Sequence, residues 1–167
     1  MTPVPARPPS DAVVALRSME RRWRGLFAGL DEDESADALA QRPGADGHAA
    51  LDHATHASRT LSLLGRALEQ IVVDDDAVLH PAVIDAAQRE WPAASAGVDE
   101  TIAELAHEAG RLADRADDVA AGDWSRSATV AGGGDVDALT VLWDAVDSAV
   151  TDLKAAEATL REVRGRT

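Results

Sequence analysis

Three long stretches of the chain place an apolar residue at alternating steps of four and three positions. Because 3.6 residues complete one helical turn, this spacing keeps the apolar residues on one side of an α-helix. The three stripes are Ala50, Ala54, Ala57, Leu61, Leu64, Leu68 and Ile71; Val98, Ile102, Leu105, Ala109, Leu112, Ala116 and Val119; and Leu139, Leu142, Val146, Ala149, Leu153, Ala156, Leu160 and Val163. Each stretch therefore predicts one long amphipathic helix.

A further helix is predicted near the start of the chain, over about residues 11–29, so that the three stripes above belong to the second, third and fourth helices in chain order. Ser10 is placed to cap it, and Asp11 lies in the first turn, where the helix dipole favours a carboxylate. Its apolar residues at helical spacing are Val13, Leu16, Trp23, Leu26, Phe27 and Leu30. Four such stripes can face one shared interior, so we predict an all-α four-helix bundle as a single domain over residues 10–167. The proline-rich residues 1–9 are predicted to be a disordered tail.

The connection between the second and third long helices is too long for a tight turn, at roughly 25 residues. We therefore predict a crossover along the bundle, which would let the third helix run parallel to the second. Residues 82–90 within it could form a short helix. The connection to the fourth helix contains Gly132, Gly133 and Gly134, which permit backbone angles that other residues avoid. Strand signals are nearly absent.

The charge of the chain excludes several classes of partner. Sixteen Lys and Arg against 30 Asp and Glu give a net charge of −14, which disfavours nucleic acid and anionic membranes. No Cys is present, which removes disulfides and thiolate chemistry. No apolar run is long enough for a membrane span, and the proline-rich start does not have the pattern of a signal peptide. We expect a cytoplasmic protein.

Two segments resemble the DinB-like family of four-helix bundles. The first runs from Arg42-Pro43-Gly44 to His56, and the second from Asp99-Glu100-Thr101 to Asp123-Trp124. The family includes mycothiol-dependent S-transferases and maleylpyruvate isomerases, and the resemblance covers roughly residues 10–160. Family members usually carry a Trp shortly before a metal-binding His. In this chain His56 matches that histidine, and His48 stands in place of the Trp.

The resemblance implies a metal site that is degenerate in this chain. Metal-binding members hold a divalent ion, such as zinc or nickel, with one His from the second helix and two from an H-x-x-x-H motif on the fourth. Mycothiol then serves as the thiol co-substrate. In family members the third-helix segment ends in a Trp, and Trp124 matches it here. Counting forward from Trp124 places the two fourth-helix positions near Asp147 and Thr151, and no histidine follows His107. We therefore expect no cofactor, or at most a divalent metal with mycothiol.

His56, His53 and Asp147 are the candidate ligands of a residual metal site. Helical phase puts His53 about 40° from the stripe residue Ala57 and His56 about 100° away, so periodicity favours His53 as the inward residue and the resemblance favours His56. Asp147 lies on the side opposite its own stripe, and Asp152 is interpreted with it as part of an acidic outer face. The alternative to a metal site is a hydrogen-bonded histidine pair at the mouth of the bundle.

The tryptophans are the main large rings in an alanine-rich chain, and they are expected to close the bundle ends or to mark contact surfaces. They are Trp23, Trp91, Trp124 and Trp143. Trp143 lies on the side of its helix away from Leu142, so it is the ring expected to face a partner chain. This placement predicts a homodimer through the fourth helix.

Two hypotheses of function follow. In the first, the chain is a degenerate DinB-like bundle that binds a small molecule or a partner without tight metal binding. In the second, it is a divalent-metal-dependent enzyme that transfers or isomerises a mycothiol-linked substrate. The missing histidines of the fourth helix favour the first hypothesis.

Overall fold

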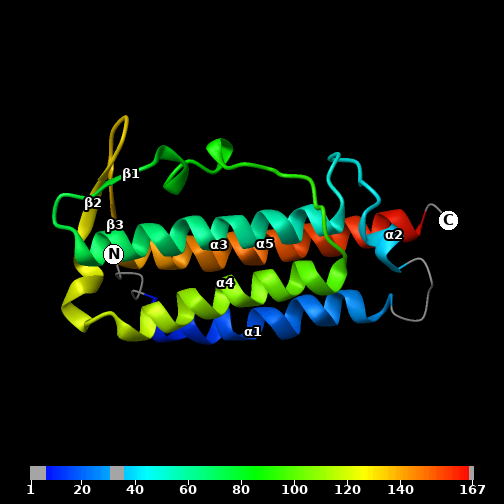
Figure 1. Ribbon diagram of the computed structural model, residues 1–167, viewed down its shortest axis with the longest axis horizontal. Coiled ribbons are helices and arrows are strands. Elements are labelled where there is room, and N and C mark those ends of the chain that lie inside the picture. Colours follow the sequence, from blue (N-terminus) through cyan, green and yellow to red (C-terminus); the bar gives the residue numbers. More distant parts are fainter. Residues whose placement is uncertain (1–6, 31–35, 166–167) are drawn as a thin grey trace, which may run out of the picture.

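The computed structural model describes residues 7–30 and 36–165 of the chain. Its four long helices are α1 (Pro9–Ala28), α3 (Ala50–Val73), α4 (Val98–Asp118) and α5 (Ala138–Arg164). They lie side by side along one axis (Figure 1), and the packed pairs are α1 with α4, α4 with α3, α3 with α5, and α5 with α1. The predicted four-helix bundle is confirmed.

The predicted apolar stripes form the core of this bundle. Every stripe residue of α3 is buried, and Leu64 and Leu112 expose only 0% and 2% of their surface. The half-buried stripe residues are Leu26, Val98, Val119 and Leu139, which lie at or near the ends of α1, α4 and α5. Helical periodicity therefore identifies the buried face of each helix correctly.

A crossover connects α3 to α4 along the length of the bundle (Figure 1), and as a result these two helices run parallel, as predicted. The crossover begins with strand β1 (Val78–Leu79) and continues through two 3₁₀ turns, η1 (Pro81–Val83) and η2 (Ala86–Gln88). These two turns take the place of the short helix expected over residues 82–90. The His80 side chain caps η1, where its Nδ1 accepts a hydrogen bond from the Ala82 amide.

A small sheet at one end of the bundle was not predicted. After α4 and a 3₁₀ turn, η3 (Ala121–Ser125), strand β2 (Ser127–Val130) pairs parallel with β1 and antiparallel with β3 (Asp135–Asp137). The turn between β2 and β3 contains Gly132, Gly133 and Gly134 with φ angles of +89°, +124° and +94°. Only glycine adopts such angles without strain, so the triple glycine makes the hairpin.

The segment before α1 packs against α5. The helix starts at Pro9 with no side-chain cap, so Ser10 is not the cap. The Trp143 indole N–H donates to the Arg7 carbonyl, and the Arg7 guanidinium lies 3.5 Å from the Trp143 ring centre. Residues 1–6 of the predicted tail lie outside the described residues. Trp143 therefore contacts the protein's own N-terminal segment.

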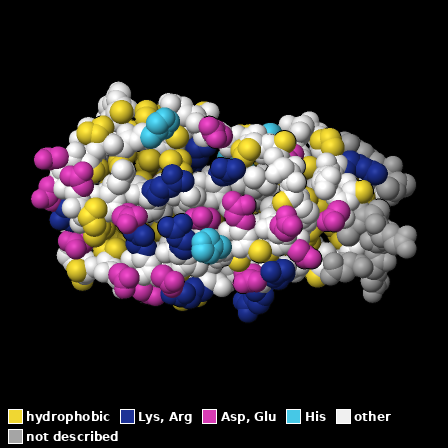
Figure 2. Space-filling model, viewed as in Figure 1, with side chains coloured by type: hydrophobic (Ala, Val, Ile, Leu, Met, Phe, Trp, Pro, Cys, Tyr) yellow, Lys and Arg dark blue, Asp and Glu magenta, His cyan; other side chains and the backbone are white. Residues whose placement is uncertain are grey.

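The surface is predominantly acidic. Figure 2 shows Asp and Glu side chains spread over the face that carries the crossover, in keeping with the net charge of −14. A short helix, α2 (Ala36–Ala40), precedes the loop that leads into α3. Over the described residues, none of the helices combines the length and the apolar composition that a membrane span requires.

Candidate functional site

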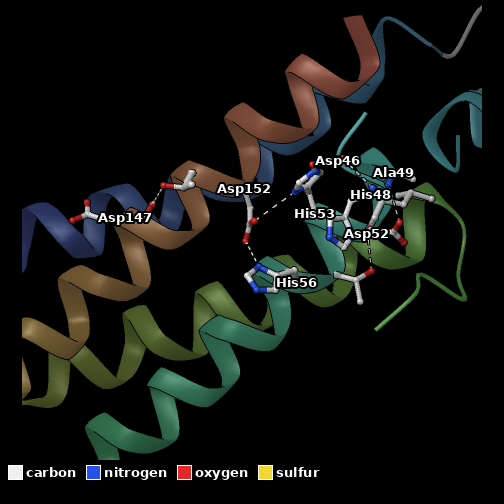
Figure 3. A network of polar contacts seen from close by, with 11 residues as sticks. Asp46, His48, Ala49, Asp52, His53, His56, Asp147 and Asp152 are labelled. Atoms are coloured by element: carbon white, nitrogen blue, oxygen red, sulfur yellow. Dashed lines mark hydrogen bonds and ion pairs between the residues drawn. The ribbon is translucent and has the colours of Figure 1, made fainter. Parts of the chain in front are cut away.

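A cluster of histidine and aspartate side chains lies between α3 and α5 (Figure 3). The first two turns of α3 contribute His53 and His56, and the middle of α5 contributes Asp152. These three side chains, which we call the His–Asp centre, are among the buried polar residues of the bundle. Asp46 and His48 approach the centre from the loop that precedes α3.

The His56–Asp152 pair is the strongest contact of the centre. His56 Nδ1 lies 2.7 Å from Asp152 Oδ2, and the two residues expose 8% and 5% of their surface. Because an ionised carboxylate can only accept, Nδ1 of His56 is assigned the proton and donates a hydrogen bond to Asp152. The other ring nitrogen, Nε2, is buried and has no hydrogen-bond partner among the described residues. This nitrogen remains available to a proton or a ligand.

His53 contacts two carboxylates more loosely. Its Nδ1 lies 3.7 Å from Asp152 Oδ1, and its Nε2 lies 3.3 Å from Asp46 Oδ2. Neither contact has hydrogen-bond geometry, since both nitrogens are without a hydrogen-bond partner in the described part of the chain. They are close polar contacts without a hydrogen bond. Both histidines are buried, so periodicity and the resemblance each identified an inward-facing residue.

Trp91 of the crossover covers the histidines. Its ring stacks on His56 at 3.8 Å between centroids and on His48 at 4.0 Å, and it meets His53 edge-on at 5.3 Å. Trp91 itself is 40% exposed. An indole stacked on imidazole rings shields them from water and limits their rotation. Trp91 thus separates the His–Asp centre from solvent.

The start of α3 holds this part of the crossover in place. Asp52 accepts one hydrogen bond from the Ala49 amide at 2.8 Å, which satisfies a free amide at the helix N-terminus. Its second oxygen accepts from the Ala94 amide of the crossover at 3.0 Å. Since Ala94 is three residues beyond Trp91, this bond fixes the segment that carries the indole.

Asp147 and Thr151, the α5 positions that match the family's two histidines, face away from the centre. Asp147 is exposed and pairs with Arg7 at 2.8 Å, and the exposed Thr151 donates its hydroxyl to the Asp147 carbonyl. The interpretation of Asp152 as part of an acidic outer face is wrong, because Asp152 is buried against His56. The physical reason is that α5 packs against both α1 and α3, so it buries a wider face than one stripe.

In the described structure the side chains of the centre are not arranged around one point, as a three-ligand metal site would require. A zinc site requires at least three protein ligands at about 2.0–2.3 Å from the ion. One turn before and after Asp152, α5 presents Ser148 and Ala156, neither of which is a usual ligand. Over residues 7–30 and 36–165, no group of three or more His, Cys, Asp or Glu side chains is arranged to hold a metal ion.

Arg89 of the crossover contacts the face of α5 that carries Asp152. Arg89 donates to the carbonyls of Ala82 and Val83 at 2.9 and 3.1 Å, and to the Ser148 hydroxyl at 3.1 Å. Burial lowers the pKa of Arg89, and the carboxylates of Asp144 and Asp152 act in the opposite direction. A guanidinium therefore supplies positive charge beside the His–Asp centre.

Asp144 lies on the same side of α5 as this arginine. Burial raises the pKa of Asp144, and the nearby charge of Arg89 opposes the shift. The sequence pattern does not indicate Arg89 or Trp91 as a site residue. Both belong to the irregular crossover, where no helical periodicity indicates which way a side chain points.

No protein-family model and no curated protein matches the chain. Among solved structures, the fold is similar to that of YfiT from Bacillus subtilis, which is described as a probable metal-dependent hydrolase with an unusual four-helix bundle topology. The TM-score is 0.72 over 99% of this chain and 93% of YfiT, at 13% sequence identity. A likeness at this identity concerns the fold and not the chemistry of the site. The chain thus shares the four-helix bundle fold of YfiT.

Proposed function

We propose that the chain is a degenerate relative of the DinB-like bundles that binds a small molecule or a partner without holding a metal ion tightly. The observation that carries this proposal is the make-up of α5. This helix directs a single ligand-type side chain, Asp152, at the histidines, and that side chain is already hydrogen-bonded to His56.

The charge around Asp152 supports the same proposal. A buried carboxylate requires a nearby positive charge or hydrogen-bond donors. Asp152 has the His56 N–H as a donor and the Arg89 guanidinium as a neighbouring cation. Because protein groups already meet this requirement, the carboxylate does not depend on a metal ion.

A divalent-metal-dependent, mycothiol-dependent S-transferase or isomerase is the second candidate. It is favoured by the buried Nε2 of His56, which has no hydrogen-bond partner within the described residues, and by the fold shared with YfiT. A zinc or nickel ion would be held by His56 and His53 with Asp152 in place of Asp147. Such an ion would act as a Lewis acid toward a thiol or a substrate oxygen.

Titration calorimetry of metal-free protein with zinc and with nickel distinguishes the two candidates. We expect no stoichiometric binding tighter than about 1 μM, because the two histidines and Asp152 are not arranged around one point in the described structure and Asp152 is already hydrogen-bonded to His56. Binding tighter than this, lost in His56→Ala and retained in Asp147→Ala, would contradict the proposal and favour the enzyme. Asp147→Ala is the matched control, since that carboxylate lies outside the centre.

The remaining parts of the proposal concern location and assembly. We propose a cytoplasmic protein without a nucleic-acid or membrane partner, as the net charge of −14 favours. The structure gives less reason to expect a homodimer through Trp143, because Arg7 of the same chain covers that ring. Sedimentation at micromolar concentration tests self-association. If the protein is a dimer and Trp143→Ser converts it to a monomer, the hypothesis of a dimer interface on α5 would be supported.

A further inference from the structure

A cavity of about 290 Å³ opens between α3 and the crossover. From α3 it is lined by Arg59, Thr60 and Arg66, and from the crossover by Arg89. Its volume is near the lower limit for sites that bind small molecules. The cavity therefore suits a ligand of a few heavy atoms.

The cavity is locally basic in an acidic protein. Three arginines line it against one carboxylate, that of Glu90. Within the described part of the chain Arg59 makes no hydrogen bond or ion pair, and Arg66 bonds only the Ser62 hydroxyl of its own helix. Figure 2 shows Lys and Arg side chains gathered on this face beside hydrophobic ones. Guanidinium groups with free N–H donors are suited to binding oxyanions.

A buried hydroxyl faces the same cavity. Thr60 is 2% exposed, yet its Oγ1 has no hydrogen-bond partner among the described residues. A helical threonine usually donates to the carbonyl four residues earlier, which Thr60 does not do. Thr60 is one turn from His56 on the same face of α3, and His56 Nε2 also lacks a partner. Unpartnered polar atoms thus extend from the His–Asp centre to the cavity.

We propose that this cavity binds a small organic anion. Arg59, Arg66 and the free N–H groups of Arg89 hold the oxyanion group of this ligand. A second polar atom of the ligand forms a hydrogen bond with the Thr60 hydroxyl. Nη1 and Nη2 of Arg89 each use one N–H for the protein, which leaves one donor on each. Leu63 and Ala82 supply an apolar wall for the ligand body. The inference rests on the proposed function in taking the chain to be a small-molecule binder.

Succinate is the probe, and ¹⁵N-labelled protein reports its binding through the arginine Nε–H and backbone amide signals. We expect saturable shifts confined to α3 and the crossover, with a Kd of about 1 mM or tighter. Arg59→Gln and Thr60→Val should each weaken binding roughly tenfold or more, because each removes one hydrogen bond to a charged ligand. The neutral isostere succinamide should not bind.

The controls separate a built site from general charge attraction. Arg21→Gln on α1 removes the same charge away from the cavity and should leave succinate binding unchanged. Thr60→Val keeps the shape of the side chain and removes an unpartnered group, so the fold should be retained, as thermal unfolding would verify. Weakening by Arg21→Gln equal to that by Arg59→Gln would overturn the inference.

Inorganic phosphate is the second probe. If phosphate binds in place of succinate and Arg59→Gln weakens it, the oxyanion site is supported and the ligand is a phosphate compound. If neither anion binds, the inference is overturned, and the zinc titration still decides the proposed function. If zinc binds tightly while succinate binds the cavity of metal-free protein, the proposed function fails and the cavity assignment stands.

Discussion

Leu64→Ala is expected to lower the free energy of unfolding by about 2 to 5 kcal/mol. Leu64 is fully buried on α3, which packs against both α4 and α5. Truncation therefore removes contacts to neighbouring helices and leaves a cavity, because the surrounding helices relax only partly into the space. Leu112→Ala on α4 is expected to fall within the same range, since Leu112 exposes 2%. Chemical denaturation of the two variants measures both effects.

Val73→Ala is the matched control for this prediction. Val73 is the last residue of α3 and is 75% exposed, so its truncation should change the free energy of unfolding by less than about 0.5 kcal/mol. Losses below half a kilocalorie at both Leu64 and Leu112 would contradict the assignment of the core. Equal losses at Leu64 and Val73 would show that burial does not determine the effect.

The helices and their buried faces could be predicted because helical periodicity is a local property. The stripe of α3, from Ala50 to Ile71, follows from residues that are three and four apart, and every member is buried. The parallel course of α3 and α4 followed from the length of the crossover alone. The small sheet could not be predicted, because β1 has only two residues and pairs with β2 about 50 positions later.

The candidate site was predictable only in part, for two physical reasons. His53 was found because a helix fixes its phase relative to the stripe of α3, whereas His56 was found because it matches the histidine of the DinB-like family that the sequence resembles. Asp152 was assigned to the surface because a single apolar stripe predicts one narrow buried face. In the structure α5 packs against both α3 and α1 and buries a wider face. Trp91 and Arg89 come from irregular backbone, where tertiary contacts such as the Asp52–Ala94 hydrogen bond decide orientation.

The second large effect is expected at the His–Asp centre. Asp152→Ala should lower the free energy of unfolding by about 1 to 3 kcal/mol or more, because it leaves the His56 N–H buried without an acceptor. His56→Ala should cost a similar amount, since it leaves a buried carboxylate without its closest donor. Asp147→Ala on the same helix is the control. Its ion pair with Arg7 is exposed, so little change is expected.

A double-mutant cycle tests whether the two residues act as a pair. Because each single substitution already removes the 2.7 Å hydrogen bond, the double variant should cost less than the sum of the singles. The expected coupling energy is about 1.5 to 3 kcal/mol, as for hydrogen bonds to charged groups. Coupling near zero would mean that His56 and Asp152 are stabilised by other neighbours. A cycle repeated on metal-free protein with unchanged coupling would show that the pair is held by the protein alone, as the proposed function requires.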